Sequence, residues 1–328
     1  RSLCGGKASP LHVRSRASGR RCRSVPRRHG KGCMLKLQGI FPPLTTPFQH
    51  DGAIYEVKLR FNVEKLNLTQ LAGYVVGGST GESVMLSTPE KVRVWEIVAK
   101  HAGPGRVLIA GAGAESVRET LELCSLAASA GYQAAMVRTP HYYRGLLSST
   151  PAQVTYFRAV ADTSPLPVLI YNIPQATGLD ISPEAVIQLS EHPNIIGIKE
   201  SNGSMEKLMR MVAECRKGFQ VLVGSAPTLY PSLMMGASGA IMAFANAAPY
   251  AAITIWEAFR TREQEAAADW QRRITTAARL VTTGYGIPGL KYAMDLNGYY
   301  GGLPRLPLVA PSAQAKREIE EAFRGIQG

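Results

Sequence analysis

The heptapeptide IIGIKES, residues 195–201, places four apolar or glycine residues directly before a lysine. A short apolar run of this kind is typical of a buried β-strand. Lys199 would then end the strand in a partly dry pocket, where burial disfavours the ammonium form. A neutral amine attacks ketones and forms a Schiff base with them. The alternative is a structural lysine whose ammonium group reaches solvent or pairs with Glu200.

Seven other apolar runs resemble this one, and stretches with helical periodicity separate them. Eight strand-then-helix units in one continuous pass predict a (β/α)8 TIM barrel. The strands are apolar on both faces, as parallel strands covered on both sides should be. An open doubly wound sheet would show a glycine fingerprint after its first strand, and residues 39–46 have none. The predicted strands are residues 39–45, 73–78, 107–111, 134–139, 168–172, 195–199, 220–224 and 240–245.

The chain is expected to divide into three parts. Residues 34–250 would form the barrel. Residues 251–328 would form a small C-terminal helical appendage, with helices over 251–262, 263–282 and 312–324, and prolines breaking the region between the last two. Residues 1–33 form a basic tail with ten Lys and Arg and no Asp or Glu, which predicts disorder.

The basic tail accounts for most of the formal charge of +13, because residues 34–328 carry 27 basic and 24 acidic residues. The tail is expected to be a transit peptide, a nucleic-acid-binding arm, or sequence upstream of a true start at Met34. The first alternative predicts a mitochondrial location, and the last predicts a cytoplasmic one. The cysteine pattern implies no disulfide framework, which fits a reducing compartment.

The remainder of the chain argues against several classes of function. No apolar run reaches the roughly 18 residues that a membrane span requires. Residues 34–328 contain no basic stripe interleaved with aromatic residues, so we expect no nucleic-acid partner. No HEXXH pattern or Cys/His cluster has metal-ligand spacing, and we predict neither a metal site nor a cofactor.

Three polar clusters follow predicted strands, where the active sites of (β/α)8 barrels lie. In GGSTGE, residues 77–82, glycines and backbone N–H groups suit an anion such as a carboxylate, although an ordinary capped turn is the alternative. In TPHYYR, residues 139–144, Arg144 has a planar fork suited to a second carboxylate, and a solvated surface arginine is the alternative. In YNIP, residues 171–174, Tyr171 is placed one strand from Lys199, where a phenol can transfer protons; the alternative is a core tyrosine with a hydrogen-bonded hydroxyl.

Together these motifs resemble the dihydrodipicolinate synthase / N-acetylneuraminate lyase family over about residues 37–310. The resemblance rests on Ser79-Thr80-Gly81-Glu82, Pro140 with Tyr142, Tyr171-Asn172-Ile173-Pro174 and Lys199-Glu200-Ser201. It implies a class I aldolase or related lyase that binds the pyruvate moiety of a small 2-oxo acid as a Schiff base. It also implies a homotetramer built from two dimers.

The resemblance also assigns roles to individual residues. Lys199 is expected to form the Schiff base, Tyr171 to act as general acid and base, and Ser79 to belong to a proton relay. Tyr142 is expected to complete the relay in a neighbouring subunit's site, with Tyr143 as its rival. The substrate-binding residues implied are Thr80, Gly81, Ser201, Gly224 and Ile241, and Arg144 joins them from the argument above.

The substrate prediction depends on Ala176. Synthases of this family carry an arginine two residues after the proline of the tyrosine motif, and alanine cannot pair with a carboxylate. The chain resembles the family's 4-hydroxy-2-oxoglutarate aldolases more closely, for example in TPHYYRG (139–145), TGLD (177–180) and GIPGLK (286–291). Cleavage of 4-hydroxy-2-oxoglutarate to pyruvate and glyoxylate is therefore predicted. The alternatives are 4-hydroxy-tetrahydrodipicolinate synthesis and cleavage of 2-keto-3-deoxy sugar acids.

Overall fold

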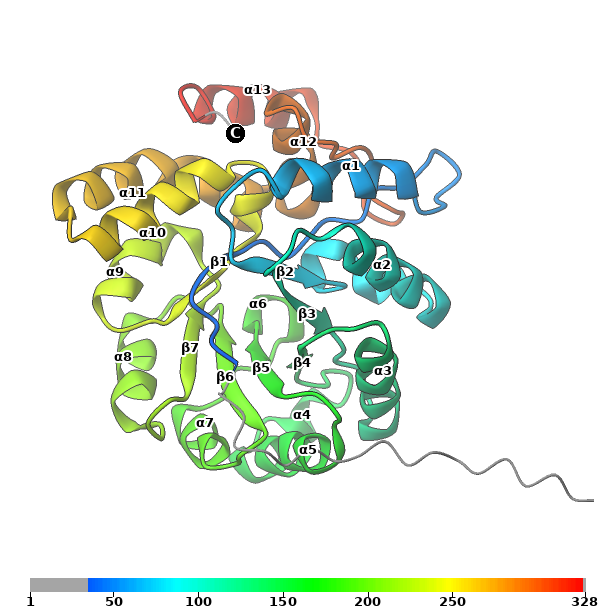
Figure 1. Cartoon of the computed structure of the whole chain (residues 1–328), viewed down its shortest axis with the longest axis vertical. Helices are drawn as coiled ribbons and strands as arrows, with labels where there is room; N and C mark the ends of the chain where they lie inside the picture. Colours follow the sequence, from blue (N-terminus) through cyan, green and yellow to red (C-terminus); the bar gives the residue numbers. More distant parts are fainter. Residues whose placement is uncertain (1–34, 327–328) are drawn as a thin grey trace, which may run out of the picture. The chain divides into compact units, whose positions relative to one another are not determined.

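The computed structural model describes residues 35–326, so the predicted basic tail lies outside the described residues. Eight strands follow one another along the chain, each separated from the next by helix (Figure 1). Their bounds are β1 Gly39–Phe41, β2 Gly73–Val76, β3 Val107–Gly111, β4 Ala134–Arg138, β5 Val168–Asn172, β6 Ile195–Glu200, β7 Gln220–Val223 and β8 Gly239–Ile241.

All strand pairs in this sheet are parallel, and from β2 to β8 each strand pairs with its neighbours in sequence. The first strand also pairs with the last, since β1 runs parallel to β8. Backbone hydrogen bonds join β1 to β2, from Ala72 N to Ile40 O (3.0 Å) and from Leu44 N to Val75 O (2.8 Å). The sheet therefore returns to its own beginning, and the predicted (β/α)8 barrel is confirmed.

Helices and short helical turns connect the strands. The α-helices before β8 are α1 Glu56–Leu66, α2 Thr88–His101, α3 Val117–Ser129, α4 Arg144–Leu147, α5 Thr150–Thr163, α6 Pro174–Thr177, α7 Pro183–Ser190, α8 Met205–Glu214 and α9 Leu229–Met234. The 3-10 turns are η1 Ser79–Gly81, η2 Ser83–Met85, η3 Ala226–Thr228 and η4 Ala243–Asn246. Several of the α-helices begin at a serine whose side chain accepts a hydrogen bond from the first turn. For α2, the Ser87 side chain and Glu90 form a reciprocal capping box.

The alternation of side chains along each strand separates two hydrophobic cores. On β2, Val75 belongs to a small cluster inside the barrel, while Tyr74 and Val76 belong to the larger core under the helices. Similarly, β5 directs Leu169 inward and Ile170 outward. Because both faces of each strand are buried, these strands are continuously apolar, which is the pattern that predicted them.

Two strands, β1 and β8, end four residues earlier than predicted. The first stops at Phe41 because Pro42 and Pro43 have no N–H to continue the ladder. The last stops at Ile241, and the predicted continuation to residue 245 instead turns into η4. There the Asn246 side chain donates to Pro43 O (2.8 Å), which ties the end of β8 to the end of β1.

The predicted C-terminal helices are confirmed, with one addition. Helix α10 packs on β1, and α11, the π-helical segment η5, α12 and α13 follow it. Prolines were expected to break the region after residue 282, but α12 forms there with Pro288 as its third residue. The first turn of a helix has no intrahelical partner for its N–H groups, so proline is tolerated. The bounds are α10 Pro249–Thr261, α11 Gln264–Arg279, η5 Leu280–Gly284, α12 Gly286–Leu296 and α13 Ala313–Ala322.

This C-terminal segment lies beside α1, where Lys65 Nζ donates to Gly298 O (2.8 Å) (Figure 1). The described residues, 35–326, form one compact unit. Within residues 35–326, no helix has both the length and the apolar character needed to cross a membrane.

Candidate active site

The two residues expected to perform the chemistry lie side by side. Tyr171 is the penultimate residue of β5 and Lys199 the penultimate residue of β6, and the two are direct partners in the register. Both are buried, with 4% and 5% of their surface exposed. Lys199 Nζ lies 4.1 Å from the centroid of the Tyr171 ring. Tyr171 belongs to the interior cluster, so the amine and the phenol share the inside of the barrel.

The turn after β2 carries the expected relay and carboxylate-binding residues. Ser79, Thr80 and Gly81 form η1, with Ser79 and Thr80 partly exposed. Glycine is required at Gly81, because a Cβ there would lie 2.9 Å from Leu44 O. The Thr46 hydroxyl donates to Gly81 O (2.7 Å), which connects this turn to the loop after β1. The turn therefore follows the C-terminal end of β2, the same end of the barrel that holds Lys199.

The paired tyrosines lie in the loop after β4 and are largely exposed, Tyr142 by 79% and Tyr143 by 67%. Their rings pack edge to face, with centroids 5.1 Å apart. Glu115 anchors the backbone of this loop by accepting from His141 N (2.9 Å) and Tyr142 N (3.0 Å). Burial raises the pKa of Glu115, but these two bonds and Arg138 outweigh it and lower the pKa overall. A charged Glu115 therefore holds the tyrosine loop.

Arg144 begins α4 and extends over the loop that follows β5. A Cβ at Gly178 would lie 2.8 Å from Arg144 Nη1 and 3.0 Å from its Cδ. Gly178 has φ +67°, a left-handed conformation that glycine adopts without strain. The glycine thus leaves room for the arginine, whose side chain remains exposed to solvent. Gly178, which the guanidinium covers, is two residues after Ala176, the position at which the family's synthases are expected to carry their arginine.

Three further predicted binding residues follow or end β6, β7 and β8. Ser201 N donates to Asn172 O (3.1 Å). Gly224 packs directly against Ser201, since a Cβ at Gly224 would lie 2.0 Å from Ser201 Oγ. Ile241 is fully buried in the interior cluster with Tyr171. The structure therefore places Ser201 and Gly224 in contact and Ile241 among the apolar side chains inside the barrel.

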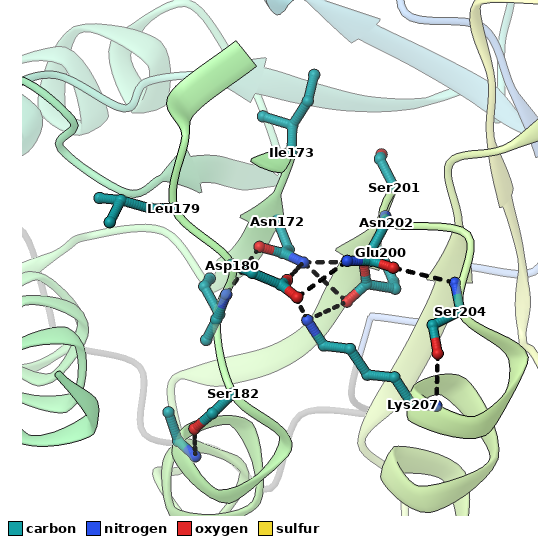
Figure 2. A network of polar contacts seen from close by, with 12 residues as sticks. Asn172, Ile173, Leu179, Asp180, Ser182, Glu200, Ser201, Asn202, Ser204 and Lys207 are labelled. Atoms are coloured by element: carbon teal, nitrogen blue, oxygen red, sulfur yellow. Dashed lines mark hydrogen bonds and ion pairs between the residues drawn. The ribbon is translucent and has the colours of Figure 1, made fainter. Parts of the chain in front are cut away.

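A partly buried polar network centres on Asn172 and Glu200 (Figure 2). These residues directly follow Tyr171 and Lys199 in the chain and therefore face the opposite side of the sheet. Asn172 Nδ2 donates to both carboxylate oxygens of Glu200, at 2.9 and 3.1 Å. Lys207 reaches in from α8 and pairs with Glu200 Oε2 at 3.2 Å.

Asp180 closes this network from the loop after α6. It accepts from Lys207 Nζ and, at 2.6 Å, from Asn172 Nδ2. Asn202 Nδ2 donates to its other oxygen at 2.9 Å. The network therefore links the ends of β5 and β6 to each other and to α8, which fixes the spacing between the two strands that carry Tyr171 and Lys199.

The sequence offered Glu200 only as an alternative partner for Lys199, and it predicted no role for the other residues of this network. Asn172, Asp180 and Glu200 lay within quoted motifs, but nothing in the sequence paired them, and Lys207 had no signal beyond its charge. Burial raises the pKa of Glu200, and the charge of Lys207 is the largest effect opposing that rise. The alternative pairing of Lys199 with Glu200 is not what the structure shows, because Glu200 pairs with Lys207.

Comparison with known proteins identifies the family. The model of the Dihydrodipicolinate synthetase family matches residues 36–325. The chain belongs to this family. As a member of the dihydrodipicolinate synthetase family it is an enzyme, a class I lyase or aldolase, as its relatives' names also indicate.

Curated relatives of the chain carry two different activities in their names. It is 38% identical over 291 residues to the "Probable 4-hydroxy-2-oxoglutarate aldolase, mitochondrial" of Emericella nidulans, covering 87% of this chain and 93% of the relative. It is 35% identical over 287 residues to a 4-hydroxy-tetrahydrodipicolinate synthase of Methanothrix thermoacetophila, covering 87% of this chain and 96% of the relative.

Solved structures share the fold over nearly their whole length. Dihydrodipicolinate synthase DapA-2 of Bacillus anthracis superposes with a TM-score of 0.85 at 26% identity, covering 90% of this chain and 100% of that one. YagE of E. coli K12, determined in complex with pyruvate, gives a TM-score of 0.81 at 28% identity, covering 88% and 98%. Within residues 35–326, no group of three His, Cys, Asp or Glu side chains is arranged to hold a metal ion.

Proposed function

We propose that this enzyme cleaves 4-hydroxy-2-oxoglutarate to pyruvate and glyoxylate through a Schiff base on Lys199. The observation that carries the proposal is the buried contact between Lys199 Nζ and the Tyr171 ring, 4.1 Å from amine to centroid, at the carboxyl ends of neighbouring strands. Imine chemistry needs a nucleophile and a proton donor. The buried Lys199 amine can supply the first and the Tyr171 phenol the second.

The reaction begins when the Lys199 amine attacks C2 of the 2-oxo acid. Loss of water gives a protonated imine, which withdraws electrons from the C3–C4 bond. Tyr171 gives its proton to the hydroxyl that leaves as water, and the resulting phenolate then removes the proton from the 4-hydroxyl group. The C3–C4 electron pair moves into an enamine as glyoxylate leaves. Protonation of the enamine at C3 and hydrolysis by water then release pyruvate and restore the free amine. Ser79, with Tyr142 from a neighbouring subunit, carries the proton between Tyr171 and solvent.

The Ser79–Gly81 turn is proposed to bind the carboxylate next to the ketone. Thr80 supplies a hydroxyl and the turn supplies backbone N–H groups, which are suitable donors for a carboxylate. Ser201 and Gly224 would line the opposite side of the site, and Ile241 its apolar floor.

Two observations favour 4-hydroxy-2-oxoglutarate as the substrate. Ala176 has no charge to hold the carboxylate of an aspartate-derived aldehyde. The exposed guanidinium of Arg144, which lies over Gly178, can instead bind the second carboxylate of a five-carbon dicarboxylic acid. The Emericella nidulans relative named as a probable 4-hydroxy-2-oxoglutarate aldolase supports this choice.

We also propose that the active form is a homotetramer of two dimers. Tyr142, Tyr143 and Leu146 expose 79%, 67% and 77% of their surfaces, which is unusual for large apolar side chains in one short segment. A second copy covering this segment would bury them. The location is proposed to be cytoplasmic, with a mitochondrial location as the alternative if residues 1–33 are a transit peptide.

The second candidate function is 4-hydroxy-tetrahydrodipicolinate synthesis from pyruvate and aspartate semialdehyde. The 35% identity to the Methanothrix thermoacetophila synthase favours it. It shares imine formation on Lys199. The imine of pyruvate would then lose a proton from C3 to give the enamine, which would attack the aldehyde. A 2-keto-3-deoxy sugar acid would enter by the same steps as 4-hydroxy-2-oxoglutarate.

The deciding experiment measures pyruvate release by the purified chain, coupled to lactate dehydrogenase, with three substrates in parallel. Efficient release from 4-hydroxy-2-oxoglutarate supports the proposal. Release only from a 2-keto-3-deoxy sugar acid, or consumption of pyruvate only with aspartate semialdehyde, would replace the substrate and leave the Schiff base in place. Absence of any borohydride-trapped pyruvate on Lys199 would reject the mechanism itself.

A further inference from the structure

Glu82, directly after the Ser79–Gly81 turn, has an uncommon conformation. Its φ of 57° and ψ of 33° are left-handed, and only Arg262 among the other non-glycine residues of 35–326 has a positive φ. Only 1% of the surface of Glu82 is exposed to solvent. A left-handed glutamate that is also buried costs free energy, so the surrounding structure has to hold it.

The groups that hold the Glu82 carboxylate come from the C-terminal region. Lys291 Nζ, from α12, lies 2.6 Å from Glu82 Oε1, and both side chains are fully inaccessible to solvent. The backbone N–H of Arg305 donates to the other oxygen, Oε2, at 2.8 Å. Both carboxylate oxygens are therefore bound by residues more than 200 positions later in the chain.

Lys291 also holds Gly81, the residue before Glu82, through Thr46. Lys291 Nζ donates to Thr46 O at 2.9 Å and to Leu303 O at 3.0 Å. Thr46 in turn donates its hydroxyl to Gly81 O at 2.7 Å. Two consecutive residues at the end of the turn, Gly81 and Glu82, are thus fixed by contacts that meet at one ammonium group.

The side chain of Arg305 fixes the far end of the same loop. Its Nη1 donates to Met85 O at 2.7 Å, and its Nη2 pairs with Glu90 at 2.6 Å. Its Nε donates to Gly52 O at 3.1 Å. These contacts also orient the Arg305 backbone so that its N–H faces Glu82.

We propose that Lys291 and Arg305 are positioning residues, which hold the Ser79–Gly81 turn in the conformation that binds the carboxylate of the 2-oxo acid. This inference rests on the proposed function, because that function places the carboxylate on the turn. Lys291 is fully buried and paired, so it acts through Glu82 and not on substrate. The C-terminal region then serves the reaction by shaping a binding site that belongs to the barrel.

The expected consequence is a loss of pyruvate affinity with little change in imine chemistry. Tyr171 lies on β5 and Lys199 on β6, and the turn follows β2, which pairs with neither of those strands. Relaxing the turn should therefore weaken carboxylate binding while leaving the amine and the phenol in contact.

The test titrates pyruvate against the fraction of full-length protein that borohydride traps, measured by intact mass. In Lys291→Met, loss of one or two hydrogen bonds to the carboxylate should raise the half-saturating pyruvate concentration about tenfold or more. The trapped fraction at saturating pyruvate and the circular dichroism spectrum should match wild type. If Lys291→Met does not fold, the double variant Glu82→Gln/Lys291→Met removes both charges and leaves no unpaired ion, and the same rise is expected.

The matched control is Lys65→Met. Lys65 also binds the C-terminal region, through Asn297 O at 3.3 Å and Gly298 O at 2.8 Å, but none of its bonds reaches the turn. Its half-saturating concentration should equal wild type. An unchanged concentration in a folded Lys291 variant, or an equal rise in Lys65→Met, would overturn the positioning role while wild-type trapping upholds the proposed function. Failure of wild type to trap pyruvate at any concentration would overturn both.

Discussion

Lys199 Nζ lies over the face of the Tyr171 ring, 4.1 Å from its centroid, and the two residues are register partners on β5 and β6. The contact joins an amine to an aromatic face, so the ring supports the lysine independently of the phenol hydroxyl. Support and proton transfer by Tyr171 can therefore be separated by removing the hydroxyl alone.

Tyr171→Phe keeps the ring beneath Lys199 and removes the proton donor. We expect pyruvate release from 4-hydroxy-2-oxoglutarate to fall by a factor of about 10²–10⁴, as for the loss of a general acid or base. Borohydride should still trap pyruvate on the variant. Lys199→Ala should abolish trapping, although the buried Lys291 remains. Near-normal turnover by Tyr171→Phe, or trapping by Lys199→Ala, would assign these roles to other residues.

Arg144→Ala tests the origin of substrate choice. Loss of a charge-assisted hydrogen bond to the second carboxylate should lower kcat/KM for 4-hydroxy-2-oxoglutarate about 10- to 100-fold. Pyruvate has no second carboxylate, so its trapping by borohydride should not change. Equal losses with both compounds would show that Arg144 supports the loop and does not bind substrate.

Lys207→Met tests the network behind the active site. It leaves the buried Glu200 carboxylate without its cation, which should lower the free energy of unfolding by about 3–5 kcal/mol. Burial already raises the pKa of Glu200, and removing Lys207 raises it further. Because protonation relieves the buried charge, the destabilisation should grow as pH rises and shrink toward acid pH.

Arg210→Met is the control for this prediction, since Arg210 lies on the same helix and pairs with Glu184 and Glu214 at the surface. An exposed pair contributes about 0–1 kcal/mol, so chemical denaturation should show little change. Similar losses in both variants, or a Lys207→Met loss that does not vary with pH, would argue against a buried charge on Glu200.

Glu90 gives the free energy of unfolding a second pH dependence. The pKa of Glu90 is lowered in the folded protein, whereas the pKa of Glu200 is raised. The hydrogen bond from Arg305 is the main cause that lowers the pKa of Glu90 from 4.5 to about 2. A carboxylate with a lowered pKa stabilises the fold above its unfolded pKa, and this contribution is lost as pH falls through the folded value. Between pH 5 and pH 2, the free energy of unfolding should therefore fall less steeply in Glu90→Gln than in wild type. Parallel profiles would exclude this contribution.

The sequence was sufficient for the fold because its signal is local. Each strand is apolar on both faces, so runs such as residues 168–172 and 195–199 stand out without knowledge of their neighbours. Tyr171 and Lys199 were found for the same reason, since each is a polar residue near the end of such a run. Adjacent parallel strands then brought the two together.

The supporting contacts were not predictable because their partners are distant in sequence. Nothing near Lys207 indicates that it reaches Glu200 and Asp180, and nothing near Lys291 indicates Glu82. The proline in α12 even argued against a helix at the place where Lys291 is presented. Binding of substrate by Arg144 stays a prediction that Arg144→Ala tests, and the relay roles that the resemblance implies for Ser79 and Tyr142 stay predictions as well.

The contacts of Glu82 have a consequence for the time at which the protein becomes active. Its two partners follow it by 209 and 223 residues, and at about 5–20 residues per second the ribosome needs roughly 10 to 45 s to make that length of chain. During this interval the remaining strands of the barrel, β3 to β8, are synthesised, but the turn after β2 lacks the groups that hold its strained end. A nascent chain that already contains Lys199 and Tyr171 should therefore bind its substrate poorly until the last helices have been made.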